Sequence, residues 1–311
     1  MELFPHDSKF NFMRVRAISL SIALVVMLVA IGAMVANGFN YALDFTGGTV
    51  AELKFDKPVS AESVRARLHA AGFESAVVQT FGAGGEMQVR LKPRAGDQAA
   101  NSGQAIVAAL QDGDNAVRLL RSDTVGPQIG KELAIDGMKA AIFVILGFLV
   151  YIWIRFEWRF AVAALTTTLH DVVMVAGWFA LSGHEFDLTV LAGILSVMGY
   201  SINDTIVVFD RVRENFRTLH KVAPAEVLNR SINQTLSRTV ITSFVALLTV
   251  VALYLYGGAS LRGMAEAQII GIVIGTLSSI FVACPLLLML GATKEDLLPR
   301  LRDDSELARR P

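Results

Sequence analysis

The sequence predicts a polytopic α-helical membrane protein with six transmembrane helices and one soluble α+β domain between helices 1 and 2. Three observations predict this. The 311 residues are 53% hydrophobic and 18% charged, with a mean hydropathy of +0.51, which is too apolar for an ordinary soluble domain. Six apolar runs come near the roughly 20 residues that a helix needs to cross the hydrocarbon core. One stretch of about 100 residues with mixed charge separates the first two runs, and this is the usual size of a domain.

The first membrane helix is predicted over residues 17–36, after a basic N-terminal tail, residues 1–16, that carries Lys9, Arg14 and Arg16. A cleaved signal peptide has a shorter apolar core, about 7–15 residues, and a small-residue cleavage site. The run here is longer and no persuasive site follows it. The sequence therefore favours an uncleaved membrane anchor.

Residues 37–136 are predicted to form the soluble domain. Alternating apolar residues indicate strands, and capped segments with helical spacing indicate helices. In order, the expected elements are Val50–Phe55, a helix from Ser60 to Gly72, Ala76–Phe81, Met87–Leu91, Asn101–Leu110 and Ala116–Arg121. Gly82–Gly85 forms the hairpin turn and Arg94–Gly103 a polar loop. The order β-α-β-β-α-β is that of a ferredoxin-like fold.

Residues 137–291 are predicted to form a bundle of five further membrane helices, followed by a C-terminal tail, residues 292–311. The apolar runs are Ala140–Ile154, Phe160–Leu181, Leu188–Phe209, Thr239–Tyr256 and Ala267–Gly291. The loop Asp210–Arg238 has two open interpretations. It either contains an amphipathic helix at the membrane surface, with Pro224 in its first turn, or is a solvated connector.

Basic residues flanking the spans predict the orientation, because cytoplasmic loops carry an excess of Lys and Arg. Both tails, the turn Arg155–Arg159 and the loop Asp210–Arg238 are rich in basic residues and fall on one side of a six-helix path. On the other side, Ser182–Asp187 has no Lys or Arg and Gly257–Gly263 has only Arg262. Both termini are therefore expected in the cytoplasm, and the soluble domain is expected to be exported.

Polar residues inside the spans are the candidate site. Asp204 lies in the fourth span beside Asn203, and an ionisable group there costs at least about 2.5–3.5 kcal/mol. His170 and Asp171 fall near the middle of the third span. A carboxylate in such a place points either to proton handling or to a buried polar staple between helices.

Arg238 opens the fifth span, and Thr242, four residues later, shares its helix face. An aspartate that alternately meets and loses Arg238 would alternately release and bind a proton. Asp204, Arg238, Thr242, Asp171 and His170 are together what a proton relay needs. Two alternatives stay open. Arg238 can be one of the basic residues that flank a span on the cytoplasmic side, and His170 can be a histidine whose hydrogen bonds are made within the bundle.

Glycines in the spans favour close packing and sliding of helices. They are Gly177, Gly193, Gly199, Gly271 and Gly275.

Other functions find little support in the residues. There is no phosphate-binding Gly-Lys-Ser/Thr loop, so no ATPase site and no enzyme activity are expected. The formal net charge is zero, which gives no indication of nucleic-acid binding. The single cysteine, Cys284, forms no internal disulfide or metal cluster, and neither a metal nor a cofactor is expected.

Two motifs resemble a known family. Gly199–Arg217, GYSINDTIVVFDRVRENFR, closely resembles the fourth-helix signature of SecF, a membrane subunit of the bacterial Sec translocase, and Asp44–Gly48, DFTGG, resembles that family's other hallmark. Leu236–Ser243 and Gly257–Leu287 are also similar to SecF. The residues carried over as motif or structural positions are Asp44, Phe45, Thr46, Gly47, Gly48, Gly199, Asn203, Asp210 and Arg211.

The resemblance implies a function. SecF pairs with SecD, a related six-helix protein, in a bundle like that of the resistance-nodulation-division transporters. The pair associates with the SecYEG channel and YajC in the bacterial inner membrane. It promotes late export of unfolded preproteins, after SecA has begun the transfer, using the proton-motive force.

Matched residue by residue, the resemblance makes Asp204 the protonatable acid and Arg238 its basic counterpart, with Thr242 on the same path. His170 and Asp171 match a His-Asp pair of helix three. Two rival functions remain: half of a small-molecule exporter of the resistance-nodulation-division type, and a structural scaffold of the translocase without proton chemistry.

Overall fold

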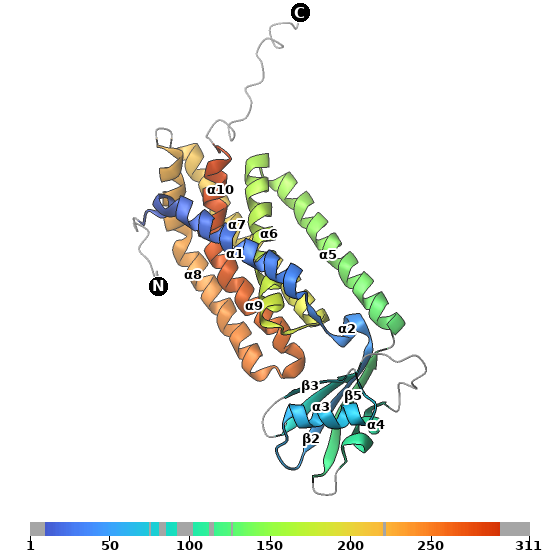
Figure 1. The fold of residues 1–311 in the computed structure, drawn as a ribbon. Helices are drawn as coiled ribbons and strands as arrows, with labels where there is room; N and C mark the ends of the chain where they lie inside the picture. Colours follow the sequence, from blue (N-terminus) through green and yellow to red (C-terminus); the bar gives the residue numbers. More distant parts are fainter. Residues whose placement is uncertain are drawn as a thin grey trace, which may run out of the picture. The chain divides into compact units, whose positions relative to one another are not determined.

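The computed structural model describes residues 10–74, 76–80, 85–91, 102–111, 115–125, 127–219 and 222–292 (Figure 1). Lys9, most of the hairpin turn and of the polar loop, and nearly all of the C-terminal tail lie outside the described residues. The chain divides into two units. The helical unit holds residues up to Asn40, Ala141–His184 and residues from Thr189 on, and the sheet unit holds Tyr41–Ala140 and Glu185–Leu188.

Within the described residues, six helices are long and apolar enough to cross a membrane, which confirms the six predicted spans. They are Phe12–Asn37, Gly130–Arg155, Trp158–Ser182, Leu188–Thr218, Pro224–Tyr256 and Ser260–Met289. The first joins a short 3-10 turn, η1 (Phe12–Val15), to α1 (Arg16–Asn37). The next four correspond to α5 (Pro127–Arg155), α6 (Trp158–Ser182), α7 (Leu188–Thr218) and α8 (Pro224–Tyr256). Among these, α1 packs on α6 (Figure 1).

Several helices extend well beyond the predicted spans; α7, for example, continues past Phe209 to Thr218. Helix α5 begins at Pro127 instead of near Ala140, because proline suits a first helical turn and the polar residues after it do not interrupt the helix. Pro224 likewise opens α8, which then runs without a break to Tyr256. The segment Asp210–Arg238, expected to contain a separate surface helix or to be a connector, is instead divided: residues up to Thr218 continue α7, and residues from Pro224 on are the first part of α8. Its apolar face is buried in the helical unit, at Val227, Leu228, Ile232 and Leu236.

The last span is not one regular helix. It consists of α9 (Ala259–Ser278), a π turn, η3 (Ser279–Ala283), and α10 (Cys284–Met289). Pro285 has no N–H group, so it cannot donate to the Phe281 carbonyl one turn earlier. The Ser19 hydroxyl of α1 lies 2.9 Å from that carbonyl oxygen and serves as a donor to it. No pattern in the sequence predicted this irregular turn, which contacts α1.

Glycines bring the helices of the bundle close together. A Cβ at Gly177 would collide with Ala30 of α1, and one at Gly271 would collide with the Val197 side chain of α7. A Cβ at Gly193 would also collide, with the Met264 carbonyl, and one at Gly275 would lie only 3.3 Å from the Ser201 Cβ, both across the α7–α9 contact. Gly199 differs. Within the described chain, a Cβ at this position would meet only the Phe148 ring, at an ordinary contact distance of 3.8 Å.

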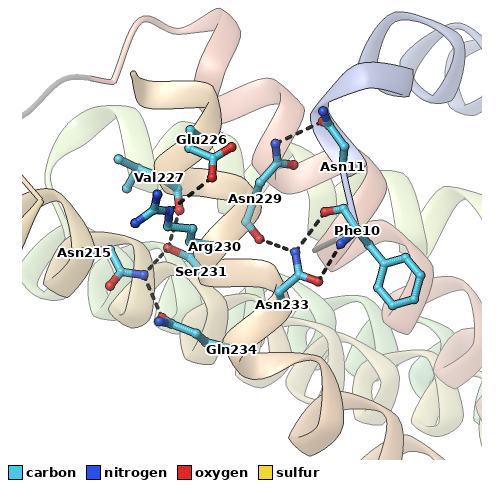
Figure 2. Close-up of polar contacts among 10 residues, drawn as sticks. All are labelled: Phe10, Asn11, Asn215, Glu226, Val227, Asn229, Arg230, Ser231, Asn233 and Gln234. Carbon is cyan, nitrogen blue, oxygen red and sulfur yellow. Dashed lines mark hydrogen bonds and ion pairs between the residues drawn. The ribbon is translucent and has the colours of Figure 1, made fainter. Parts of the chain in front are cut away.

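One end of the bundle holds an aromatic core and a group of amide hydrogen bonds. Phe160 packs edge-on against Phe209 with ring centroids 5.4 Å apart. At the same end of α8, the Asn233 amide donates to the Phe10 carbonyl oxygen (2.9 Å) and its Oδ1 accepts from the Phe10 N–H (3.2 Å). Figure 2 shows this pairing and the neighbouring contact from Asn229 to Asn11 (3.0 Å). Buried amides thus tie the segment before α1 to α8.

The sheet unit contains a four-stranded antiparallel sheet with strand order β3-β4-β2-β5. Its elements are β2 (Gly48–Phe55), α3 (Ala61–Ala70), β3 (Val77–Thr80), β4 (Glu86–Leu91), α4 (Ser102–Leu110) and β5 (Val117–Val125). Ser60 caps α3 as expected, accepting from the Ser63 N–H (3.2 Å). The core between helices and sheet is built from Leu53, Leu68, Met87 and Ile106.

Three short elements complete this unit. They are β1 (Asn40–Tyr41), α2 (Leu43–Thr46) and β6 (Glu185–Phe186), and β1 pairs with β6. The Ala42 N–H donates to the Phe186 carbonyl (2.9 Å). The loop before α7 therefore belongs to the sheet unit, a long-range pairing that neither segment's sequence reveals.

Candidate functional site

Asp204 is buried among three helical segments. Only 6% of its surface is exposed. Its Oδ1 accepts a hydrogen bond from the Thr239 hydroxyl of α8 (2.9 Å). Its Oδ2 is also buried and has no hydrogen-bond partner among the described residues. A buried carboxylate with one free oxygen is under-satisfied, so it has capacity for a proton or for one further donor.

Arg238 and Thr242 lie on a different face of α8 from Thr239. Both side chains are exposed, and the Thr242 hydroxyl donates to the Arg238 carbonyl (2.8 Å). Neighbouring residues of a helix point about 100° apart, so with Thr239 on Asp204 the Arg238 side chain points elsewhere. In the described chain no hydrogen bond or ion pair joins Arg238 to Asp204. The Arg238 guanidinium therefore acts on the Asp204 carboxyl through its charge alone, without a direct contact.

Asp171 is the more completely bound of the two acids. It is fully buried, and its Oδ2 accepts from the hydroxyls of Ser201 on α7 and Ser278 at the end of α9, both at 2.6 Å. Its Oδ1 lies 2.9 Å from His170 Nδ1. Three donors around one carboxylate compensate much of its desolvation cost. Asp171 thereby connects α6, α7 and α9.

Serine hydroxyls connect the surroundings of the two acids. Ser201 lies one turn before Asp204 on α7, so both point toward the same side. Ser278 bonds Asp171, while the next residue, Ser279, faces Asp204 and donates to the Thr276 carbonyl (3.0 Å). Ser279 is also the first residue of the π turn, and such turns occur frequently at functional sites. Ser201 and Ser278 thus bind Asp171, while Ser279 places the start of the π turn beside Asp204.

Three of these residues were not predicted as members of the site: Thr239, Ser278 and Ser279. A signal was present, because all three are hydroxyl residues within or bordering apolar runs. Asn203, by contrast, is exposed and does not face the two acids. The amide beside Asp204 in sequence points away from it, since consecutive helical residues do not share a face.

The charged end of α7 has a structural role in the fold. Arg155 Nη2, at the end of α5, lies 2.7 Å from both carboxyl oxygens of Asp210. Arg213 pairs with Glu157 at 3.1 Å. Within the described residues, Arg211 pairs only locally, with Glu214 at the surface (3.0 Å). Asp210 therefore fastens α7 to the α5–α6 turn, whereas Arg211 does not.

The DFTGG segment forms α2 and the turn into β2 within the sheet unit. Asp44 Oδ2 accepts from the N–H of Leu188, the first residue of α7 (3.2 Å), which satisfies one of the free donors at that helix start. Phe45 packs against Tyr41 and Phe186.

The rest of the motif shapes the backbone. The Thr46 hydroxyl donates to the Ala42 carbonyl (3.1 Å). Gly47 has φ +66°, and at Gly48, with φ +127°, a Cβ would collide with the Leu91 carbonyl. Only glycine fits both the dihedral angle and the space at Gly48. In the described chain, no three His, Cys, Asp or Glu residues cluster as a metal site would require.

Comparisons with known proteins agree on one family. The profile of "Protein export membrane protein SecD/SecF, C-terminal" matches residues 105–293, and that of the "SecD/SecF GG Motif" matches residues 32–59. The chain is 42% identical to the protein translocase subunit SecF of Vibrio alginolyticus, over 96% of this chain and 95% of that protein. It is also 42% identical to the SecF of Pseudomonas aeruginosa, over 95% and 96%, and 40% identical to that of Escherichia coli O157:H7, over 96% and 93%.

Solved structures show the same likeness. The crystal structure of SecDF from Thermus thermophilus, described as a translocon-associated membrane protein, matches with a TM-score of 0.83 and 39% identity, over 92% of this chain. SecDF in a super-membrane-facing form matches with a TM-score of 0.67 and 38% identity, over 98%. This chain covers only 39% and 40% of those two chains.

Proposed function

This chain belongs to the SecF family of protein translocase subunits, and we propose that it is driven by a proton that Asp204 takes up and releases. As a SecF subunit of the Sec translocase it is a transport component rather than an enzyme. Its six spans and its bacterial relatives mark it as a multi-pass inner-membrane protein. We infer that the energy comes from the proton-motive force and not from an ATPase site of its own.

The observation that carries the proposal is the half-satisfied carboxyl of Asp204. Oδ1 is held by Thr239, while the buried Oδ2 has no partner in the described chain. A proton on Oδ2 would satisfy that atom, and a cation brought near it would expel the proton. Arg238 and Thr242 on α8, and His170 with Asp171 on α6, are the proposed further members of the relay. Rotation or sliding of α8 against α7 would exchange Thr239 for Arg238 beside Asp204.

A second protein completes this arrangement. The exposed side of α8 carries Arg238, Thr242 and the apolar side chains of Phe244, Val245 and Leu248. The solved SecDF chains are more than twice as long as the part that this chain matches. We propose that SecD supplies the other half of the bundle. The proposed assembly further includes SecYEG, YajC and the SecA pathway, with an unfolded preprotein as substrate.

The orientation is part of the proposal. With both termini cytoplasmic, the sheet unit lies on the outer side of the membrane, where an emerging preprotein is found. The antiparallel strand order β3-β4-β2-β5, with α3 and α4 as crossovers, supports the ferredoxin-like interpretation of this domain. A reporter that is active only outside the cytoplasm should be active when fused after Gln98. Activity of a cytoplasmic reporter at that point would contradict the orientation.

The test of the function replaces Asp204 by Asn, which keeps the shape and removes the titrating group. Vesicles that contain SecD and the variant chain are compared for preprotein completion with and without a proton gradient. The gradient-stimulated part should disappear, while a matched variant of an exposed acid, Asp136→Asn, should retain it. Gradient stimulation that survives in Asp204→Asn would reject the proton-driven function.

The scaffold function is the second candidate. It is favoured by Asp171, which accepts three donors from three helical segments, as a purely structural staple would. A scaffold would show equal stimulation by the gradient in wild type and Asp204→Asn. The small-molecule exporter is set aside, because the relatives that match nearly the whole chain are protein translocase subunits.

A further inference from the structure

Three hydroxyl groups form a cluster one helical turn from the Asp204 site. The Tyr200 hydroxyl of α7 and the Thr276 hydroxyl of α9 each lie 2.7 Å from the hydroxyl oxygen of Ser243 on α8. Ser243 is buried, with 8% of its surface exposed. The cluster therefore lies where α7, α8 and α9 pack together.

The Ser243 hydroxyl is fully used within this cluster. A hydroxyl has one hydrogen to donate and two lone pairs that accept. Ser243 donates to the Thr239 carbonyl (2.7 Å) and accepts from Tyr200 and Thr276. The Thr276 hydroxyl also lies 2.6 Å from the Ile272 carbonyl of its own helix, so two acceptors share its hydrogen. Tyr200 is therefore the steadier of the two donors to Ser243.

The cluster and the acid site join the same faces of α7 and α8. Tyr200 precedes Asp204 by four residues on α7, and Ser243 follows Thr239 by four residues on α8. Residues four apart share a helix face. The Tyr200–Ser243 bond and the Thr239–Asp204 bond are therefore successive contacts between these two helices, one turn apart.

The surface that receives Ser243 is tightly packed. A Cβ on Gly271 of α9 would collide with the Val197 side chain of α7, and one on Gly275 would lie 3.3 Å from the Ser201 Cβ. Small residues at a helix contact let the two backbones approach closely. The two hydroxyl donors thus project from a closely packed pair of helices, against which α8 is placed.

We propose that Tyr200 and Thr276 are positioning residues that hold α8 through Ser243. Their hydrogen bonds keep α8 at the rotation at which Thr239 faces Asp204. A rotation that moved Thr239 away from the acid would also carry Ser243 away from both donors, because these two residues share a helix face. The cluster therefore opposes that rotation. This inference rests on the proposed function, to which it adds the element that sets the resting position of α8.

Export measurements test the positioning role. Tyr200→Phe removes one hydroxyl and keeps the ring, and vesicles that contain SecD and the variant chain are compared with and without a proton gradient. Loss of one hydrogen bond should lower the gradient-stimulated part about five-fold. Tyr254→Phe is the matched control. Tyr254 is also partly buried, but its hydroxyl accepts from Arg262 (3.3 Å), and this variant should retain the stimulation.

Thr276 allows a rescue experiment. Thr276→Val keeps the shape of the side chain and removes the hydroxyl, so it should lower the stimulation. Thr276→Ser keeps the hydroxyl and should retain it. A role in packing alone would give the opposite order, because valine keeps the γ-methyl group that serine lacks.

Thermal unfolding of the purified chain in detergent tests whether Tyr200 acts through Thr239. Tyr200→Phe and Thr239→Val should each lower the melting midpoint. The double variant should shift it by less than the sum of the two single shifts, because both changes weaken the same placement of α8. Tyr254→Phe combined with Thr239→Val should give additive shifts, as independent sites do.

Stimulation in Tyr200→Phe equal to that in Tyr254→Phe would overturn the proposal, and so would additive shifts for Tyr200→Phe and Thr239→Val. If Asp204→Asn loses the stimulation while Tyr200→Phe keeps it, the positioning role alone fails. If Asp204→Asn keeps it, the proton-driven function fails, and the melting midpoints still decide whether Tyr200 positions Thr239. Should Tyr200→Phe fail to fold, the two Thr276 variants decide the matter.

Discussion

The Thr239 hydroxyl donates to Asp204 Oδ1 across 2.9 Å, and this contact joins α8 to α7 beside the π turn of the last span. The residue before it, Arg238, is exposed and makes no such contact in the described chain. The arginine and the threonine therefore occupy adjacent faces of one helix, and only the threonine reaches the acid. A rotation of α8 by about one residue, near 100°, would interchange them and so change the charge near Asp204.

Thr239→Val should reduce gradient-stimulated export strongly, because it keeps the shape of the side chain and removes the donor to Asp204. A buried acceptor that loses its partner costs about 1–3 kcal/mol, and more when it is charged. Thr239→Ser keeps the hydroxyl and should retain most of the stimulation. The measurement is preprotein completion in vesicles that contain SecD, with and without the gradient. Equal activity of the Val and Ser variants would show that this hydrogen bond is dispensable.

Asp171→Ala should destabilise the bundle by about 3–5 kcal/mol, since three buried donors from His170, Ser201 and Ser278 lose their acceptor. Asp171→Asn keeps a carbonyl oxygen and should lose less. Asp136→Ala, at an exposed acid, should change the unfolding free energy by less than about 0.5 kcal/mol. Thermal unfolding of the purified chain in detergent provides the comparison. An Asp171→Ala variant as stable as Asp136→Ala would contradict the role of Asp171 in joining the helices.

Gly271→Ala and Gly147→Ala are matched substitutions in two membrane helices. A Cβ at Gly271 would collide with the Val197 side chain, so overpacking should destabilise by about 1–3 kcal/mol. A Cβ at Gly147 meets nothing within 4 Å in the described chain, and alanine there should be neutral or stabilising by up to about 1 kcal/mol. Thermal unfolding midpoints should move in opposite directions or at least differ clearly. Equal midpoints would mean that the α7–α9 contact adjusts without strain.

Glu185, in the sheet unit, should make stability depend on pH. Burial raises the pKa of Glu185 above its ordinary value of 4.5, against the opposing effect of Arg90, with which it forms an ion pair. A carboxyl whose pKa is higher in the folded state binds more protons when folded, so stability falls as the pH rises from near 4.5 through the folded pKa. Glu185→Gln removes this contribution and should flatten the slope, which melting curves at a series of pH values would measure. A slope unchanged in Glu185→Gln would exclude Glu185 as its source.

Much of the architecture was predictable from local patterns. Long apolar runs identified all six spans, because a helix in a bilayer must satisfy its own backbone and needs a fixed length of apolar residues. Alternation and caps such as Ser60 identified the strand and helix order of the sheet unit. The first residues of α5 and α8 were harder to predict, because polar residues after Pro127 and Pro224 extend these helices ahead of the apolar stretch.

The site was predictable only in part. Asp204, Asp171 and His170 stood out because a polar residue in an apolar run is expensive. Which hydroxyl meets which acid was not predictable, because it depends on how α7, α8 and α9 are rotated about their axes. Arg238 and Thr239 are one position apart, and no local pattern says which of them faces Asp204.

The sequence by itself determined the number of spans, the family and the identity of the buried acids, since these depend on residue type and length along the chain. Tertiary structure alone decided that Thr239 holds Asp204 and that Ser201 and Ser278 hold Asp171. The physical reason is that a side chain acquires a partner only when two helices are packed at a particular rotation. Glycines and a π turn set that rotation through contacts between residues far apart in the chain.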